Sequence, residues 1–92
     1  MQPGAFRWNE WNLEHAGRHG IGQQEAERVV RTARRPYPLR AGDRKWIVWG
    51  PGQSGRLVQV VFVLDDDGTA YIIHARPLTP RERSRYKRRR RE

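Results

Sequence analysis

Cysteine is absent from this chain of 92 residues, which excludes disulfide bonds and thiolate metal sites. The chain also has no run of about 18 apolar residues, the length that a membrane-spanning helix needs. Met1–Ala5 has neither the basic start nor the apolar core of a secretory signal peptide. We therefore expect a cytoplasmic protein with no membrane partner, and its length predicts one domain with one hydrophobic core.

Acidic residues are few, because 10 Asp and Glu stand against 19 Lys and Arg, a net charge of +9. Residues 76–92 contain eight Arg and one Lys against two Glu, a net +7, which leaves +2 for residues 1–75. Such a block attracts polyanions, and Arg suits phosphate because its guanidinium donates two parallel hydrogen bonds. A run of like charges is also typical of a solvated tail. We expect one domain over residues 1–87 and a basic tail over 88–92.

A first helix is predicted from Asn9, a typical N-cap residue, to about His19. Gly20 then ends it, because glycine readily adopts the left-handed conformation that follows a helix. His15 and His19 lie one turn apart on the same side as two tryptophans. This spacing permits a metal site, but no H-E-x-x-H pattern is present. The favoured interpretation is structural, with the histidines packed beside the tryptophans or bonded to backbone, although either could border a cleft.

A second helix should begin within Ile21–Glu25, after which apolar residues recur with the period of one buried helical stripe. The stripe consists of Ala26, Val29, Val30 and Ala33. Pro36 and Pro38 cannot continue the helix, so we expect a loop that extends through Asp43.

Strands dominate the second half of the chain. Asp65–Gly68 favours a hairpin turn over a calcium site, because the alternating ligands of an EF-hand are missing. The sequence predicts an α+β domain, with two N-terminal helices packed on a 3–4-stranded antiparallel sheet and a short C-terminal helix. The expected strands are Lys45–Gly50, Arg56–Leu64 and Thr69–Arg76, with Phe6–Trp8 as a further short candidate.

The last strand and the helix after it combine structural and chemical signals. Residues alternate along a strand, so His74 and Arg76 should share one face with Ala70 and Ile72. Pro77 ends the strand because it has no N–H. Thr79, Pro80 and Glu82 then form the signature of a helix start, with Thr79 and Glu82 as a capping box.

His74 is the natural acid or base on this face, because its ordinary pKa is the nearest to physiological pH. Arg76 and Arg56 would hold a phosphate, and Glu82 or Tyr86 could contribute a further proton transfer. Two structural alternatives remain. His74 can be an exposed strand residue without a role, and Arg76 can form a salt bridge with Glu82 or interact with a helix end.

The order and spacing of several short motifs resemble those of the BrnT family of bacterial toxins. These motifs are Phe6-x-Trp8 with Asn12 and His15, then His19-Gly20-Ile21, then a second helix that contains Glu25, then Ile72–Arg76, and finally Pro80–Arg83 with Tyr86. BrnT proteins are small ribonucleases with a RelE-like fold, which BrnA antitoxins inhibit. The resemblance covers nearly the whole chain. His74 stands where family members commonly have serine, and Gly22 where Ser or Thr is usual at the helix cap.

The resemblance implies an endoribonuclease toxin that inhibits translation, with no metal and no cofactor. In this chemistry the ribose 2′-OH attacks the adjacent phosphate while arginines stabilise the developing charge. Arg76 matches the family's arginine at the end of the last strand. The implied partners are RNA and a BrnA-like ribbon-helix-helix antitoxin, which would cover the sheet face of Arg56, His74 and Arg76. The expected catalytic residues are His74, Arg76, Arg56, Glu82 and Tyr86, and the expected RNA-binding residues are Arg81, Arg83, Arg85 and Lys87.

Two other functions remain open at this point. The chain can be a non-catalytic module whose arginines contact nucleic acid or an acidic protein, with salt-sensitive binding and no cleavage. It can also be a degenerate toxin that keeps the fold and its partner but has lost activity, because the departure at His74 falls within the expected site.

Overall fold

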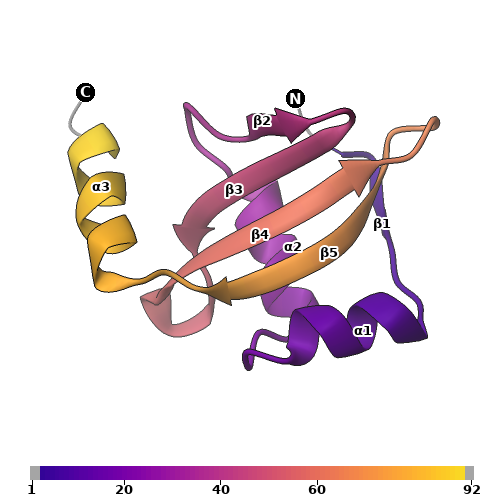
Figure 1. Cartoon of the computed structure of the whole chain (residues 1–92), viewed down its shortest axis with the longest axis horizontal. Coiled ribbons are helices and arrows are strands. Elements are labelled where there is room, and N and C mark those ends of the chain that lie inside the picture. The colour runs from indigo at the N-terminus through magenta and orange to yellow at the C-terminus, as the bar shows by residue number, and fades with distance from the viewer. Residues whose placement is uncertain (1–2, 91–92) are drawn as a thin grey trace.

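The computed structural model describes residues 3–90, and this part of the chain has an α+β fold (Figure 1). None of the helices within these residues is long and apolar enough to cross a membrane. The elements, in chain order, are β1 (Ala5–Arg7), α1 (Glu10–Gly17), α2 (Gln23–Arg31), β2 (Leu39–Gly42), β3 (Lys45–Pro51), the 3-10 turn η1 (Gln53–Gly55), β4 (Leu57–Leu64), β5 (Thr69–Pro77) and α3 (Pro80–Arg90).

The sheet of residues 3–90 has five strands in the order β1-β5-β4-β3-β2, and it is mixed. The prediction of a purely antiparallel sheet of three or four strands is therefore wrong. The candidate strand near Phe6 does form, but β1 runs parallel to β5. The segment expected as a loop through Asp43 contains β2, which pairs with β3. Strands of three and four residues are too short to show the two-residue period by which a sequence reveals them.

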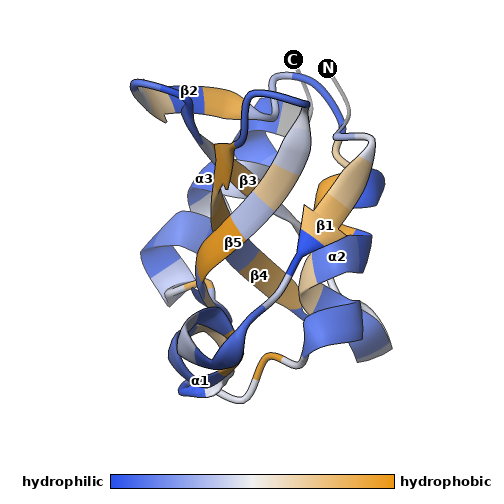
Figure 2. Cartoon of the chain, turned by 90° about the vertical axis from the view of Figure 1, so that its right-hand side faces the viewer, coloured by the Kyte–Doolittle hydropathy of each residue, from blue (hydrophilic) through white to orange (hydrophobic). Residues whose placement is uncertain are grey.

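Helix α2 covers one face of the sheet and lies behind it in Figure 1. Three residues of its predicted apolar stripe, Ala26, Val29 and Val30, are buried. The fourth, Ala33, lies beyond the end of α2 and is half-buried. Val29 packs against Gly50 of β3. Figure 2 shows the apolar residues mainly on the strands, whereas the helices are coloured mostly hydrophilic. The core therefore lies between α2 and the middle of the sheet.

Local capping signals define where two helices begin. Asn9 caps α1 in a capping box with Asn12, and Thr79 and Glu82 form the predicted capping box of α3. Helix α1 ends at Gly17, two residues before the predicted end at His19, and Gly20 has the expected positive φ of 80°.

Helix α3 follows the end of β5 and continues to Arg90 (Figure 1). Residues 88–90 of the expected tail are thus helical. Residues 91 and 92 lie outside the described part of the chain.

A buried carboxylate joins α2 to the connection between β3 and β4. The Glu25 side chain is 3% exposed and accepts hydrogen bonds from Arg56 Nε, Arg56 Nη2 and the Gln53 amide. Because Arg56 stabilises the charged form, the pKa of Glu25 is lowered from its ordinary value. The backbone of Gly52 passes so close that a Cβ there would lie 2.3 Å from Glu25 Oε2. This position consequently has room for glycine only.

We expect Gly52→Ala to destabilise the fold by about 1–3 kcal/mol, because the added methyl group displaces the Glu25 carboxylate from its donors. Urea unfolding followed by circular dichroism measures the effect. Gly17→Ala is the control, since a Cβ at Gly17 meets nothing within 4 Å. Equal midpoints for wild type and Gly52→Ala would show that the Glu25 cluster does not constrain this connection.

Candidate functional site

The strand β5 presents His74 and Arg76 on the same face, as predicted, but not together with Ala70 and Ile72. A β-bulge interrupts the β4–β5 ladder, because Val61 pairs with His74 whereas Phe62 pairs with Ile72. Ile73 is the additional residue, so the alternation of faces shifts by one position. Ala70 and Ile72 are fully buried in the core, while His74 and Arg76 are half-buried on the opposite face.

His74 lies beside a second histidine. The rings of His19 and His74 are 5.7 Å apart between centroids and meet edge to face at 62°. Burial lowers the pKa of His74 below its ordinary value of 6.5, and the nearby Arg76 and His19 lower it further. Because this pKa lies below 6.5, the His74 imidazole is neutral at pH 7 and is able to accept a proton.

The sequence left open that His15 or His19 could border the cleft, but it favoured a structural role for both and did not identify His19 as the partner of His74. The predicted helix extended to His19, so the sequence placed His19 on the same helix face as His15 and gave both a structural role. The structural interpretation is confirmed for His15, whose ring stacks on Trp11 at 3.8 Å and whose Nδ1 donates to the Trp11 carbonyl oxygen. His19 instead lies in the turn after α1 and is exposed. The only signal was the His19-Gly20 pair, since a glycine favours a turn at this point.

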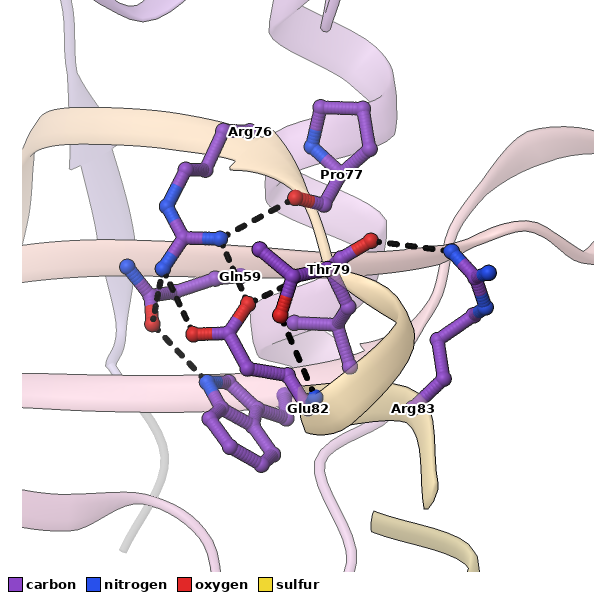
Figure 3. Close-up of polar contacts among 8 residues, drawn as sticks. Gln59, Arg76, Pro77, Thr79, Glu82 and Arg83 are labelled. Atoms are coloured by element: carbon purple, nitrogen blue, oxygen red, sulfur yellow. Dashed lines mark hydrogen bonds and ion pairs between the residues drawn. The ribbon is translucent and has the colours of Figure 1, made fainter. Parts of the chain in front are cut away.

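Arg76 forms the salt bridge that was the structural alternative for this residue. Its Nη1 and Nη2 donate to the two oxygens of Glu82 at 2.6 and 2.8 Å (Figure 3). The same guanidinium donates to the Pro77 carbonyl oxygen and to Gln59 Oε1. Arg76 and the Thr79 amide together lower the pKa of Glu82 to about 2. In this arrangement a carboxylate occupies the positions where a phosphate would bind Arg76.

Arg56 is not part of this surface. Its guanidinium binds Glu25 on the side of the sheet that α2 covers, so the expectation of one face with Arg56, His74 and Arg76 is wrong. Arg56 Nη2 also donates to the Gly20 carbonyl oxygen at 2.9 Å. Through this bond Arg56 contacts the turn that carries His19.

The remaining expected catalytic residues also have structural partners. Tyr86 is 5% exposed, and its ring stacks against Tyr37 at 6.0 Å between centroids. Glu82 combines the ion pair to Arg76 with the capping box of α3. Glu82 therefore fastens α3 to β5, and Tyr86 packs α3 against the loop before β2. A proton transfer by either side chain stays a prediction.

The outer face of α3 carries the basic surface that the sequence predicts. Arg81, Ser84, Arg85 and Arg88 line a shallow hollow of about 280 Å³. Within residues 3–90 no carboxylate lies within ion-pair distance of Arg81, Arg85, Lys87 or Arg88. Arg83 differs, because its Nη1 donates to the Leu78 carbonyl oxygen. Uncompensated guanidinium groups that are one helical turn apart suit the phosphates of a polyanion.

No group of three or more His, Asp or Glu side chains in the described residues is arranged to hold a metal ion. Comparison of the chain with protein-family models, with curated proteins and with solved structures finds no match.

We expect Glu82→Gln to lower the free energy of unfolding by about 3 kcal/mol at pH 7, because the wild-type pKa is depressed from 4.5 to about 2. A depressed carboxylate pKa stabilises the fold above the unfolded-state pKa, and this stabilisation is lost as the pH falls. The difference between wild type and variant should therefore shrink between pH 4.5 and pH 2. Urea unfolding across this range measures it.

The matched control is Glu14→Gln, which removes an exposed ion pair with Arg18 and should cost less than about 1 kcal/mol. A cost for Glu82→Gln that stays the same from pH 7 to pH 3 would contradict an origin in the ionised carboxylate.

Proposed function

We propose that the protein is a metal-independent RNA endonuclease, the toxin component of a bacterial type II toxin–antitoxin system that inhibits translation. The proposal includes a BrnT-type, RelE-like fold and rests on the order of the motifs between Phe6 and Tyr86. The observation that carries the catalytic part is the contact between the rings of His19 and His74, 5.7 Å apart. Two imidazoles that lie side by side can act as the base and the acid on one phosphate bound next to them.

His74 acts as the base in this mechanism, because its lowered pKa keeps it neutral at pH 7. It accepts the proton of the ribose 2′-OH as the 2′-oxygen forms a bond to phosphorus. His19 gives a proton to the departing 5′-oxygen as the bond from phosphorus to that oxygen breaks. The products are a 2′,3′-cyclic phosphate and a free 5′-OH, and one proton has moved from substrate to His74 and one from His19 to product.

The cations that hold the RNA belong to α3 in this proposal. Arg76 lies near His74 in the sequence of β5, but the Glu82 carboxylate neutralises the charge of Arg76. Arg76 can therefore bind a phosphate only if the phosphate displaces this carboxylate. Arg81, Arg85 and Arg88 need no such exchange. They attract RNA to the end of the sheet and fix its backbone beside the histidine pair.

A BrnA-like ribbon-helix-helix antitoxin is the proposed protein partner. Two large apolar side chains of α1, Trp11 and Leu13, are each 47% exposed. Trp11 lies close to Tyr71 of β5, on the strand that carries His74. A partner that covered these side chains would bury apolar area and close access to the histidines.

A non-catalytic RNA-binding module is the second candidate. It is favoured by the ion pairs of Arg56 and Arg76, because two arginines expected to stabilise the transition state are held by carboxylates. This candidate predicts RNA binding that weakens with salt but yields no cleavage products. A degenerate toxin would in addition bind the antitoxin.

We expect purified protein to cleave single-stranded RNA in the presence of EDTA. Replacing either histidine, as His74→Gln or His19→Gln, should lower the rate by about 10²–10⁴-fold. The rate should rise with pH along a limb whose apparent pKa lies below 6.5, because His74 must be neutral to act as the base. Gel analysis of end-labelled RNA gives the rate and identifies the cyclic phosphate.

His15→Gln is the matched control, since His15 stacks on Trp11 and should leave the rate close to that of wild type. The double variant His19→Gln with His74→Gln, purified in the same way, reports any contaminating ribonuclease. Full activity in both single variants would overturn the site. If the wild type binds RNA but does not cleave it, the non-catalytic binding module is the function that fits.

The helix α3 gives an independent prediction about salt. Arg85→Ala should reduce the slope of log K against log salt concentration by about 0.7 for single-stranded RNA, because one phosphate contact is lost. Fluorescence anisotropy with labelled RNA at several salt concentrations measures this slope. Arg44→Ala, which removes an arginine paired with Asp66 at the opposite end of β4, should leave the slope unchanged. A smaller change for Arg85→Ala than for Arg44→Ala would place the RNA elsewhere.

A further inference from the structure

A second basic hollow lies at the open edge of β3, where it passes between α2 and α3. Its volume is about 220 Å³, and no acidic residue contributes to its wall. Strand β2 pairs only with the first half of β3, so the second half of β3 borders this hollow as a free edge. The lining residues are Arg28, Thr32, Arg34, Trp49, Gly50, Pro51 and Tyr86.

The two cations of this hollow are uncompensated. Arg28 and Arg34 are exposed, and within residues 3–90 no carboxylate lies within ion-pair distance of either side chain. Helix α2 ends nearby, and its C-terminus carries a partial charge of roughly −0.5, which alone would repel an anion. Two full positive charges outweigh it. Thr32 donates through its Oγ1 and its amide to the Arg28 carbonyl oxygen, which satisfies this end of the helix.

The hollow is physically connected to the proposed catalytic surface. Trp49 Nε1 donates to Gln59 Oε1 at 2.9 Å, and Arg76 Nη2 donates to the same oxygen. Trp49, Gln59 and Arg76 are register partners on three adjacent strands, so the wall of the hollow is about 10 Å from the backbone of Arg76. Tyr86 extends the wall from α3, whose outer face carries the free arginines.

The geometry points to a subsite for one nucleotide of the RNA, on the β3 side of the phosphate that is cleaved. Arg28 and Arg34 bind the phosphate of this nucleotide, and Trp49, Pro51 and Tyr86 contact its sugar. The volume is below the roughly 300–1,000 Å³ of pockets that enclose a drug-sized molecule, so the base projects outside. This inference rests on the proposed function for the identity of the ligand, and it predicts that RNA spans the sheet from β5 to β3.

The test uses ¹⁵N-labelled protein with the substitution His74→Gln, which keeps the RNA intact during titration with a single-stranded hexanucleotide. We expect the Gly50 amide and the Trp49 indole N–H resonances to shift upon binding. Arg28→Ala and Arg34→Ala, each in the same background, should weaken binding about tenfold, the loss of one charge-assisted contact. Arg35→Ala is the matched control, because Arg35 is also exposed but does not line the hollow, and it should weaken binding less than about twofold.

Three results would overturn the subsite. Shifts confined to α3 would show that RNA does not reach β3, and an equal loss for Arg35→Ala would show that only diffuse charge matters. Binding of adenosine 5′-monophosphate as tight as that of the hexanucleotide would assign the hollow to a free nucleotide. Cleavage is measured separately. A wild type that does not cleave RNA but still binds it through Arg28 and Arg34 would refute the proposed nuclease activity and support the proposed subsite.

Discussion

The β-bulge at Ile73 is the constraint on which the candidate site depends. Without it, the two-residue period of β5 would place His74 and Arg76 on the core face together with Ala70 and Ile72. A charged guanidinium in that core would carry a large desolvation cost. The additional residue lets the first half of β5 contribute to the core and then turns the polar side chains outward, while Ala75 remains buried. Core formation and access to His74 are thus compatible on a single strand.

Carboxylates divide the arginines into two groups with different roles. Glu25 and Glu82 each hold one arginine bidentately, and these two pairs fasten the β3–β4 connection and α3 to the rest of the fold. The other group consists of Arg28, Arg34, Arg81, Arg85 and Arg88, for which the described residues supply no carboxylate partner. The net positive charge is therefore concentrated at the end of the sheet near α3, and this field would steer a polyanion toward His74.

The histidine pair shows how a turn can provide a chemical group. His19 reaches His74 because α1 ends at Gly17 and the chain reverses through Gly20. Arg56 secures this turn by its bond to the Gly20 carbonyl oxygen, and Glu25 in turn orients Arg56. A chain of contacts that begins at the buried Glu25 of α2 thereby reaches the exposed turn that carries His19. The arrangement explains how Arg56, which binds Glu25 on the α2 side of the sheet, also contributes to the surface that carries the two histidines.

The sequence by itself determined those features that depend on residues close together in the chain. Capping at Asn9 and Thr79, the buried stripe of α2, the central strand β4 and the end of β5 near Pro77 all follow from local periodicity and turn chemistry. The shared face of His74 and Arg76 was also predictable. Tertiary structure alone decided the parallel pairing of β1, the bulge, the contact of His19 with His74 and the choice of Glu25 as the partner of Arg56. These features join segments distant in sequence, and packing of the whole core selects among many pairings that local preferences leave nearly equal in energy.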